Sequence, residues 1–299
     1  MLNRNEFDLL QVVMSRGYSN QRELAKALGV SLGTANTLFK RLVTQGLVGE
    51  KGEVTAAGLR ALKPYKVDNA IIMAAGMSSR FAPLSYEKPK GVLKVKGEIL
   101  IERQIRQLQE AGIADITVVV GYMKEKFAYL AKEFGVKMVE NPDYAKWNNT
   151  STLMKVLSRL KNTYVCSSDN YFSSNVFEPY VFEAYYSAAY YPGPAKEWGI
   201  KTDSRGRIVG IDHYPVDMWC MMGHVYFSRT FSEAFKPILK REFKNDNTKL
   251  ELWEAVFERN VRDLPMYIRM YPEGVVREFD SVADLCKFDR SYIKYLPKV

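Results

Sequence analysis

Short apolar runs alternate with amphipathic segments from residue 69 onward, and this alternation limits the choice of fold more than any other feature. Strands are expected at 70–75, 115–122, 136–141 and 163–170, separated by helices at 99–112, 124–135 and 150–161. Strands separated by helices of this length favour a largely parallel sheet with right-handed crossovers. Ligands bind such sheets at the carboxyl ends of the strands, where Gly76, Gly121 and Asp169 fall.

The second half of the chain follows a different pattern. After residue 180 the sequence becomes aromatic and strand-like, which indicates antiparallel strands added to the parallel ones. Two late helices are expected, around 230–241 and 248–262. Residues 67–299 are therefore predicted to form one α/β domain with a Rossmann-like mixed sheet.

Residues 1–66 predict a separate small domain. Their apolar spacing gives three helices, of which the second can be capped by Ser19 or Asn20 and the third by Ser31. The stretch 48–58 then predicts two short strands around a Lys-Gly turn, as in a wing. Pro64 disfavours the helical conformation for the residue before it, so the boundary between the domains is placed at residue 66.

This segment resembles bacterial winged-helix DNA-binding domains along essentially its whole length. The resemblance implies that the third helix enters the major groove of DNA. Bases would be faced by Ser31, Gly33, Thr34 and Thr37, and phosphates would be met by Lys40, Arg41 and Lys51. Ten Lys and Arg residues against five Asp and Glu give the segment +5 of the chain's net charge of +9. Because its groove-facing residues are small, a dimerisation or docking unit is the alternative.

The stretch "IIMAAGMSSRFAPLSYEKPKGVL", residues 71–93, ends a buried strand in small residues and places positive charge just beyond it. Small residues let the backbone approach a ligand and direct N–H groups at it, while Arg80 and Lys90 add fixed charge. The loop is typical of a triphosphate cradle, although it is neither GxxxxGK[ST] nor GxGxxG. The alternative is a tight turn after the strand with a solvated basic rim.

The same stretch resembles the nucleotidyltransferase signature, in which Ala-Gly-x-x-[Ser/Thr]-Arg is followed further on by Pro-Lys. Residues 69–290 are similar to the bacterial CTP:phosphocholine cytidylyltransferases, a branch of the sugar-1-phosphate nucleotidyltransferase family. The likeness extends, in order, to "VVVGYMKEKFAYL", "NPDYAKWNNTSTL", "SSDNYF", "KEWGI" and "EFDSVADL". One departure is Ser78, where relatives often have Gly, and this change restricts the backbone of the loop.

The resemblance implies transfer of CMP from CTP to phosphocholine, giving CDP-choline and pyrophosphate. The CTP phosphates would be held by the loop residues Ala75, Gly76, Ser78 and Arg80, with Lys90 against the α-phosphate. The cytosine and ribose would lie near Tyr122, Asn149 and Ser151. The phosphate oxygen of the acceptor is already an anion at neutral pH, so no general base is required. A chain with only two histidines, His213 and His224, suits such a reaction.

The resemblance also implies a magnesium ion held by Asp169 and Asp280, because hard carboxylate oxygens suit Mg²⁺. Asp169 comes directly after an apolar strand, and Asp280 ends another expected strand, so both can converge on one cleft. The alternatives are structural. Asp169 could cap the end of its strand, and Asp280 could cap a helix beginning at Ser281.

Choline favours a cage of aromatic faces, because a quaternary ammonium has no N–H group to donate. Glu197, Trp198 and Glu278 match the choline-site positions of the family. Further candidates for the acceptor site are the rings of Tyr171, Tyr190, Tyr191 and Trp253 and the carboxylate of Glu254. For each ring the alternative is packing in the core.

Two other functions are compatible with the sequence. One is a nucleotidyltransferase for a different acceptor, such as phosphoethanolamine, 2-aminoethylphosphonate or a sugar 1-phosphate. The other is a winged-helix transcription regulator whose transferase-like domain senses a nucleotide or a choline compound. The set Gly76, Arg80, Lys90, Asp169 and Asp280 favours the enzyme, because a sensor needs no pair of metal carboxylates.

Composition indicates in which cellular compartment the protein is expected. Cys166, Cys220 and Cys286 are far apart and form no CxxC motif, which favours a reducing compartment. No run of 18 apolar residues is present and the first residues do not follow the pattern of a signal peptide. A cytoplasmic protein without membrane insertion is therefore expected. The sequence leaves the oligomeric state open, a homodimer included.

Overall fold

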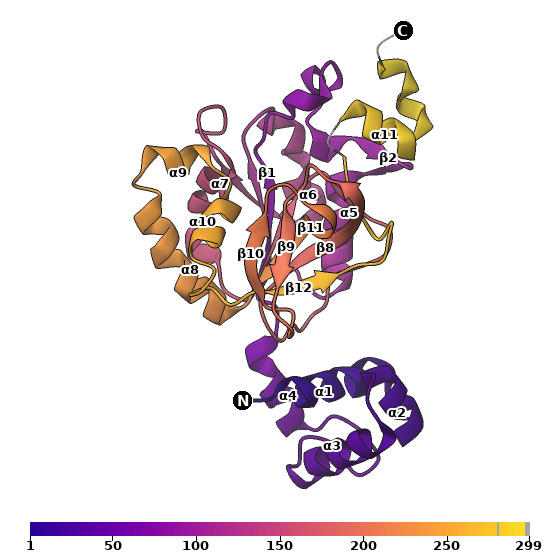
Figure 1. Ribbon diagram of the computed structural model, residues 1–299. Helices are drawn as coiled ribbons and strands as arrows, with labels where there is room; N and C mark the ends of the chain where they lie inside the picture. The colour runs from indigo at the N-terminus through magenta and orange to yellow at the C-terminus, as the bar shows by residue number, and fades with distance from the viewer. Residues whose placement is uncertain (280, 297–299) are drawn as a thin grey trace. The chain divides into compact units, whose positions relative to one another are not determined.

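The computed structural model describes residues 1–279 and 281–296 of the 299-residue chain (Figure 1). These residues divide into two compact units. The first consists of residues 1–66 together with Tyr180–Phe182, and the second contains the remaining described residues.

The first unit is a helical cluster with a short wing. Its helices are α1 (Arg4–Arg16), α2 (Gln21–Leu28), α3 (Leu32–Thr44) and α4 (Ala56–Leu62), followed by a 3-10 turn at Lys63–Tyr65. Asn20 caps α2 through its side-chain oxygen, which accepts the N–H groups of Arg22 and Glu23. Ser31 caps α3 by accepting the N–H of Thr34. Leu38, Phe39 and Leu42 on the inner face of α3 are buried in the core of this unit.

The wing is shorter than the sequence pattern predicted. Instead of two strands, a single antiparallel bridge joins Val48 to Val54. The Gly49 N–H donates to the Glu53 carbonyl at 2.8 Å, inside that bridge. The chain reverses within these few residues and α4 begins at Ala56, so no room remains for a longer ladder.

Tyr180–Phe182 belong to the first unit although they come from far along the chain. Tyr180 pairs with Lys66 in an antiparallel bridge, and the Val181 N–H donates to the Tyr65 carbonyl at 2.9 Å. The Phe182 ring stacks on Tyr65 with centroids 5.3 Å apart and lies 5.4 Å from the ring of Phe7. The sequence pattern did not predict this inclusion.

The second unit is built on one mixed sheet in the order β10-β9-β11-β6-β1-β4-β5. Four of its strands are parallel, namely β1 (Asn69–Ala74), β4 (Ile116–Val120), β5 (Lys137–Glu140) and β6 (Thr163–Ser167). Their side chains in β1 and β4 are almost entirely buried, as expected where helices cover both faces of a parallel sheet. The predicted parallel core is confirmed.

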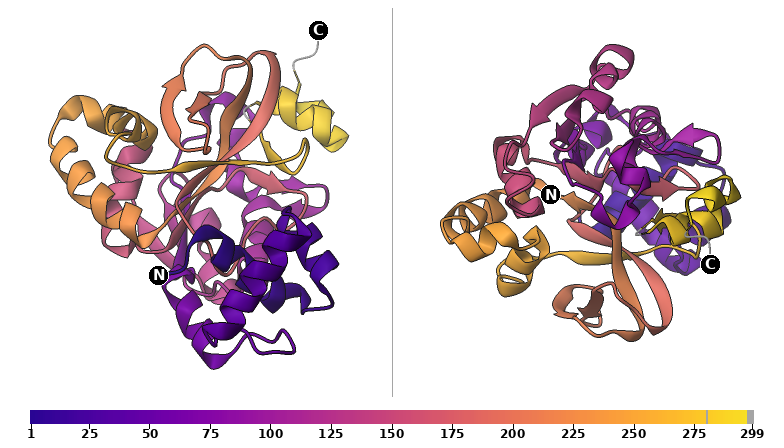
Figure 2. Two further views of the ribbon diagram at one scale, coloured as in Figure 1. Left: turned by 60° about the horizontal axis from the view of Figure 1, so that its bottom comes forward. Right: turned by 90° about the horizontal axis from the view of Figure 1, so that it is seen from above.

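Antiparallel strands extend this core, namely β8 (Tyr185–Pro194), β9 (Gly199–Thr202), β10 (Ile208–Asp212) and β11 (Val216–Phe227). A further strand, β12 (Tyr267–Met270), runs parallel to β8. The outer ends of β8 and β11 form an arm that projects from the body of the second unit (Figure 2). Two small ladders lie apart from this sheet, one joining β2 (Lys94–Val95) to β3 (Glu98–Ile99) and one joining β7 (Asn170–Phe172) to β13 (Val276–Glu278).

The helices of the second unit are α5 (Leu100–Glu110), α6 (Tyr129–Phe134), α7 (Asn149–Lys155), α8 (Arg229–Glu242), α9 (Asp246–Leu250), α10 (Trp253–Arg259) and α11 (Val282–Phe288). Helices α7 to α10 gather at one side of the sheet (Figure 1). The main core includes Phe227, Phe231, Phe235 and Phe257. The single helix predicted at 248–262 is two helices, because the chain is extended at residues 251 and 252.

Candidate active site

The loop after β1 is shaped by an unusual backbone conformation. Ser78 has φ 54° and ψ 32°, the left-handed region that glycine adopts most easily. Its hydroxyl oxygen accepts the backbone N–H of Lys90 at 3.3 Å, which ties the loop to the following basic segment. The departure from glycine noted in the sequence therefore falls at a position that needs a positive φ, and serine keeps that conformation while adding a hydrogen bond.

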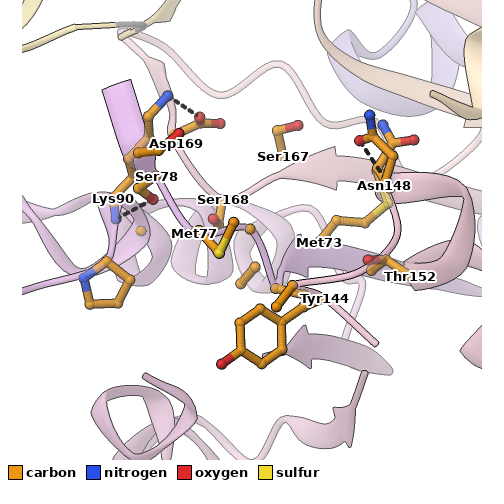
Figure 3. A pocket seen from close by; sticks show the side chains of 18 of the residues that line it. Met73, Met77, Ser78, Lys90, Tyr144, Asn148, Thr152, Ser167, Ser168 and Asp169 are labelled. Carbon is orange, nitrogen blue, oxygen red and sulfur yellow. Dashed lines mark hydrogen bonds and ion pairs between the residues drawn. The ribbon is translucent and has the colours of Figure 1, made fainter. Parts of the chain in front are cut away.

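Lys90 and Asp169 form an ion pair at the carboxyl end of the sheet (Figure 3). Lys90 Nζ lies 3.1 Å from Asp169 Oδ2, and the two side chains are only 11% and 16% exposed. The ammonium group also lies 4.7 Å from the centre of the Phe81 ring. Lys90 begins a 3-10 turn at Lys90–Val92, and Asp169 follows β6, so the parallel sheet brings the two predicted residues together.

A first cavity of about 680 Å³ opens beside this pair. The predicted residues Ala75, Gly76, Ser78, Arg80, Lys90, Asn149 and Asp169 line it. Residues that were not predicted complete the wall, among them Trp147 together with Met73, Tyr144, Thr152, Ser167 and Ser168, the last five of which are labelled in Figure 3. Most of these residues lie in "NPDYAKWNNTSTL" and "SSDNYF". The two motifs therefore indicated this part of the site, although they did not predict a role for these residues.

One wall of this cavity is held in place by hydrogen bonds across the chain. The Asn148 N–H donates to the Lys249 carbonyl at 2.8 Å, and the Asn148 side chain donates to the Leu250 carbonyl at 3.2 Å. Thr150 Oγ1 donates to the Glu251 carbonyl. The start of α7 is thus fastened to the segment before α10, which supplies Leu250 and Leu252 to the same cavity.

Two residues predicted near the base and ribose have other partners. Tyr122 is not among the residues that line the cavity, and its hydroxyl donates to the Ser85 carbonyl at 3.0 Å. Ser151 is fully buried, donating to the Asn148 carbonyl at 2.8 Å and accepting from Asn141 at 3.0 Å. Both residues therefore make hydrogen bonds within the segments that surround the cavity.

A second cavity of about 980 Å³ adjoins the first, and Arg80 lines both. Its wall includes the predicted carboxylates Glu197 and Glu278 together with Glu273 and Asp284. The rings that face it are Tyr190, Tyr191, Trp219, Tyr271, Phe279 and Phe288. The Trp219 ring meets the Tyr190 ring edge-on at 5.7 Å. The sequence did not predict Trp219 as a site residue. Its neighbours in the sequence are apolar, as they would be for a tryptophan in the core.

Several residues predicted for the acceptor lie outside the wall of this cavity. Trp253 is 1% exposed and packs between the rings of Tyr186, Phe227 and Phe235, so its ring is part of the core. Trp198 packs on the main core and meets the His213 ring at 4.7 Å.

Tyr171 and Glu254 are also absent from the wall. Tyr171 lies against Phe288 and beneath the Arg103 guanidinium. The Glu254 carboxyl accepts hydrogen bonds from Tyr186 and Asn149 instead.

The predicted metal ligands are only partly covered by the described residues. Asp169 lines the first cavity, and Asp280 lies outside the described residues. Among residues 1–279 and 281–296 no group of three or more His, Cys, Asp or Glu could hold a metal ion. A hard carboxylate oxygen at Asp169 fits Mg²⁺, which is commonly held by one or two carboxylates together with substrate phosphates.

In the first unit, the predicted DNA-contacting residues lie on one face of α3. Ser31, Thr34, Thr37 and Arg41 are exposed, while the opposite face of the helix is buried. Ser31 and Thr34 share a hydrogen bond between their hydroxyls at 2.8 Å. The Arg41 guanidinium is paired with the Glu6 carboxylate at 3.0 Å.

The remaining sequence expectations concern cysteines and membranes. Cys166, Cys220 and Cys286 are free and buried. Across the part of the chain that the structure describes, no helix has the length and apolar character needed to cross a bilayer.

Comparison with known proteins identifies both parts of the chain. Residues 70–199 match the model of the MobA-like NTP transferase domain, and residues 2–48 match that of the winged helix-turn-helix DNA-binding domain. The 2-aminoethylphosphonate cytidylyltransferase of Lancefieldella rimae is 33% identical over 232 residues, which cover 76% of this chain and 94% of that protein. The choline-phosphate cytidylyltransferase of Streptococcus pneumoniae is 30% identical over 220 residues, covering 74% of this chain and 96% of that protein.

Two solved structures of cytidylyltransferases have the same fold as this chain. The CTP:phosphocholine cytidylyltransferase from Streptococcus pneumoniae superposes with a TM-score of 0.70 at 30% identity, covering 75% of this chain and 98% of that one. The inositol-1-phosphate CTP transferase from T. maritima has the same fold, with a TM-score of 0.59 at 18% identity.

The fold, together with a cavity at the carboxyl ends of the parallel strands, defines a nucleotidyltransferase. More narrowly, the chain belongs to the cytidylyltransferase family, and a winged helix-turn-helix domain precedes its transferase domain.

Proposed function

We propose that the protein transfers CMP from CTP to phosphocholine and releases pyrophosphate. The observation that carries this proposal is the pair of cavities that share Arg80. The first is lined by basic residues and the loop at Gly76, and the second is lined by aromatic rings and carboxylates. A nucleotide in the first cavity would present its α-phosphorus to an acceptor phosphate entering from the second.

The nucleotide phosphates would bind the loop from Ala75 to Arg80. Gly76 has no atom within 4 Å of where a Cβ would stand, so the backbone there is open to a ligand. Arg80 and Lys90 supply positive charge on the same wall. Lys90 would neutralise the charge that develops on the α-phosphate, a contribution typical of a charge-stabilising donor in an active site.

The reaction needs positioning more than proton transfer. An acceptor phosphate oxygen forms a bond to the α-phosphorus of CTP, and the bond from that phosphorus to the bridging oxygen breaks with pyrophosphate leaving. The attacking oxygen is already an anion, so no proton must be removed. Arg80 lines both cavities and can contact both phosphate groups, which favours in-line attack.

Mg²⁺ belongs to the same proposal. Asp169 would hold it from the first cavity, and Asp280 remains the predicted second ligand. When bound, the ion would offset the negative charge of the nucleotide phosphates. Lys90 is paired with the same carboxylate, so its positive charge would lie beside the ion and the phosphates.

The acceptor proposal depends on the second cavity. A trimethylammonium group is attracted by the faces of aromatic rings and by nearby negative charge. Tyr190 and Trp219 offer ring surface, and Glu197 and Glu278 offer carboxylates in the same cavity. These features support phosphocholine as the acceptor.

A second acceptor is favoured by a separate observation. The 33% identical relative is named a 2-aminoethylphosphonate cytidylyltransferase, and a primary ammonium would find four carboxylates around this cavity. The two acceptors differ in the hydrogen bonds that an ammonium can donate and a quaternary nitrogen cannot.

The test is a pyrophosphate-release assay with each of the four NTPs, Mg²⁺ and a panel of acceptors. The panel contains phosphocholine, phosphoethanolamine, 2-aminoethylphosphonate and a sugar 1-phosphate. The proposal expects activity with CTP and phosphocholine above all other pairs. Preference for 2-aminoethylphosphonate would favour the second acceptor. No pyrophosphate release with any pair would reject both acceptors.

For the first unit, we propose binding of double-stranded DNA through the exposed face of α3. Thr34 and Thr37 would face base edges, and Lys40 lies exposed on the same helix where it can meet a phosphate. Selection from a random duplex pool, followed by titration at several salt concentrations, tests this. Affinity that falls steeply with salt and is lost in Lys40→Glu is expected, and an equal affinity in that variant would overturn the proposal.

A further inference from the structure

Both polar atoms of the Asn149 side chain have protein partners although the residue lines the first cavity. Its Oδ1 accepts the Trp253 N–H at 2.8 Å, and its Nδ2 donates to Glu254 Oε2 at 3.4 Å. One amide therefore contacts two successive residues at the start of α10. These bonds use one of the two amide N–H groups and one of the two lone pairs of the oxygen, and they join two parts of the cavity wall.

Glu254 is held from two sides. Besides the bond from Asn149, its Oε1 accepts the Tyr186 hydroxyl at 3.0 Å. Burial raises the pKa of Glu254 to about 7, while the hydrogen bonds from Tyr186 and Asn149 act in the opposite direction. Burying a carboxyl group costs free energy, which its hydrogen bonds only partly offset. We therefore ask which part of the structure the bonds to Glu254 hold in place.

What these bonds fix is the wall of the first cavity. Asn149 stands at the start of α7, and Leu250 and Leu252 stand just before α10. The Asn149 amide joins these two pieces, and Glu254 sets the orientation of that amide by accepting its N–H group. Without the Glu254 carboxyl the amide would lose this acceptor and would be held by the bond from the Trp253 N–H alone.

We propose that Glu254 is a positioning residue for the nucleotide, acting through Asn149 to fix the wall of the first cavity. The inference rests on the proposed binding of CTP in that cavity. It assigns Glu254 no contact with either substrate and separates it from the acceptor site. Loss of Glu254 should weaken nucleotide binding and leave the turnover of bound nucleotide and the acceptor's KM almost unchanged.

The first experiment measures the Kd for CTP by calorimetry in the presence of Mg²⁺, on the full chain. Glu254→Met keeps the length of the side chain but accepts no hydrogen bond. We expect its Kd to rise about tenfold, as for the loss of one hydrogen bond. We expect kcat at saturating CTP to change by less than about threefold.

Rescue separates hydrogen bonding from charge. In Glu254→Gln the amide oxygen can accept from Asn149 while the amide nitrogen donates to the Tyr186 hydroxyl, so the Kd should stay within about threefold of the wild-type value. The matched control is Glu258→Met, one turn further along α10, where the carboxylate is paired with His213 at 3.1 Å. The control should bind CTP as the wild type does.

A double-mutant cycle tests the route through Asn149. Asn149→Ala should raise the Kd by a similar factor, and adding Glu254→Met to it should produce little further change. Fully additive effects would overturn the proposal, as would a normal Kd in Glu254→Met or an equal rise in the KM of the acceptor. If Glu254→Met fails to fold, Tyr186→Phe removes the other bond to the carboxyl and should raise the Kd about threefold, whereas an unchanged Kd would count against the proposal.

The outcome can be separated from that of the proposed function. A wild-type chain that binds no nucleotide would refute the assignment of the first cavity. Tight binding of CTP by both the wild type and Glu254→Met would refute only the role of Glu254.

Discussion

Glu254 makes the stability of the second unit depend on pH in a direction opposite to that of most carboxylates. Burial raises its pKa from 4.5 to about 7. The folded chain therefore holds a proton on Glu254 at pH values where the unfolded chain has released it. Stability must fall as pH rises between these two pKa values, because there the folded state binds more protons. Glu254→Gln removes this dependence.

The magnitude follows from the pKa values. One pKa unit corresponds to about 1.4 kcal/mol. A difference of about 2.5 units, from 4.5 to about 7, therefore makes ionisation cost the fold at most about 3.5 kcal/mol at pH values well above 7. Below pH 4.5 the group is neutral in both states and contributes no pH dependence. The free energy of unfolding of the wild type, minus that of Glu254→Gln, should fall by about 2.5 kcal/mol between pH 5 and pH 8.

Urea unfolding followed by tryptophan fluorescence measures this difference. The four tryptophans, Trp147, Trp198, Trp219 and Trp253, all lie in the second unit, so the signal reports that unit. Titration of all other groups cancels between the variants. Glu233→Gln, an exposed carboxylate on α8, is the control and should show a flat difference. A difference for Glu254→Gln that is flat, or that rises with pH, would refute the argument.

Three further predictions concern other parts of the molecule. Lys90→Met should lower kcat by about two to three orders of magnitude in the pyrophosphate-release assay, as when one charge-stabilising donor is removed, and near-normal turnover would remove Lys90 from the mechanism. Ser78→Gly should be more stable to urea than Ser78→Ala by about 1–2 kcal/mol, since both lack the hydroxyl and only alanine keeps the cost of a positive φ; equal midpoints would contradict this. Trp219→Ala should raise the KM of phosphocholine and leave that of CTP unchanged, whereas Trp253→Ala should lower the stability of the fold by about 3–5 kcal/mol; the reverse pattern would show that the two rings have been assigned wrongly.

The parallel core could be predicted because its pattern is local. Each strand is an apolar run next to a helix of matching length, so periodicity alone locates β1, β4, β5 and β6. The carboxyl ends of those strands bring the loop at Gly76 and the acid at Asp169 to one edge, and this also follows from topology.

The rest of the site depends on contacts between distant segments, which periodicity does not encode. Trp219 and Trp253 are both aromatic residues in apolar surroundings, yet the first lines a cavity and the second is enclosed by other rings. Helix α10 is separated from α9 because the backbone at Glu251 is extended and accepts a hydrogen bond from Thr150, about a hundred residues away. A single sequence contains no signal for such a pairing.

The small unit holds three residues, Tyr180–Phe182, that are encoded more than a hundred positions after its last helix. A gene fragment that stops at residue 66 would leave the rings of Phe7 and Tyr65 without the phenyl group that packs on them. Such a fragment should be prone to aggregation when expressed alone. Transfer of the small unit to another protein would therefore require Tyr180–Phe182, or a substitute for them, in addition to residues 1–66.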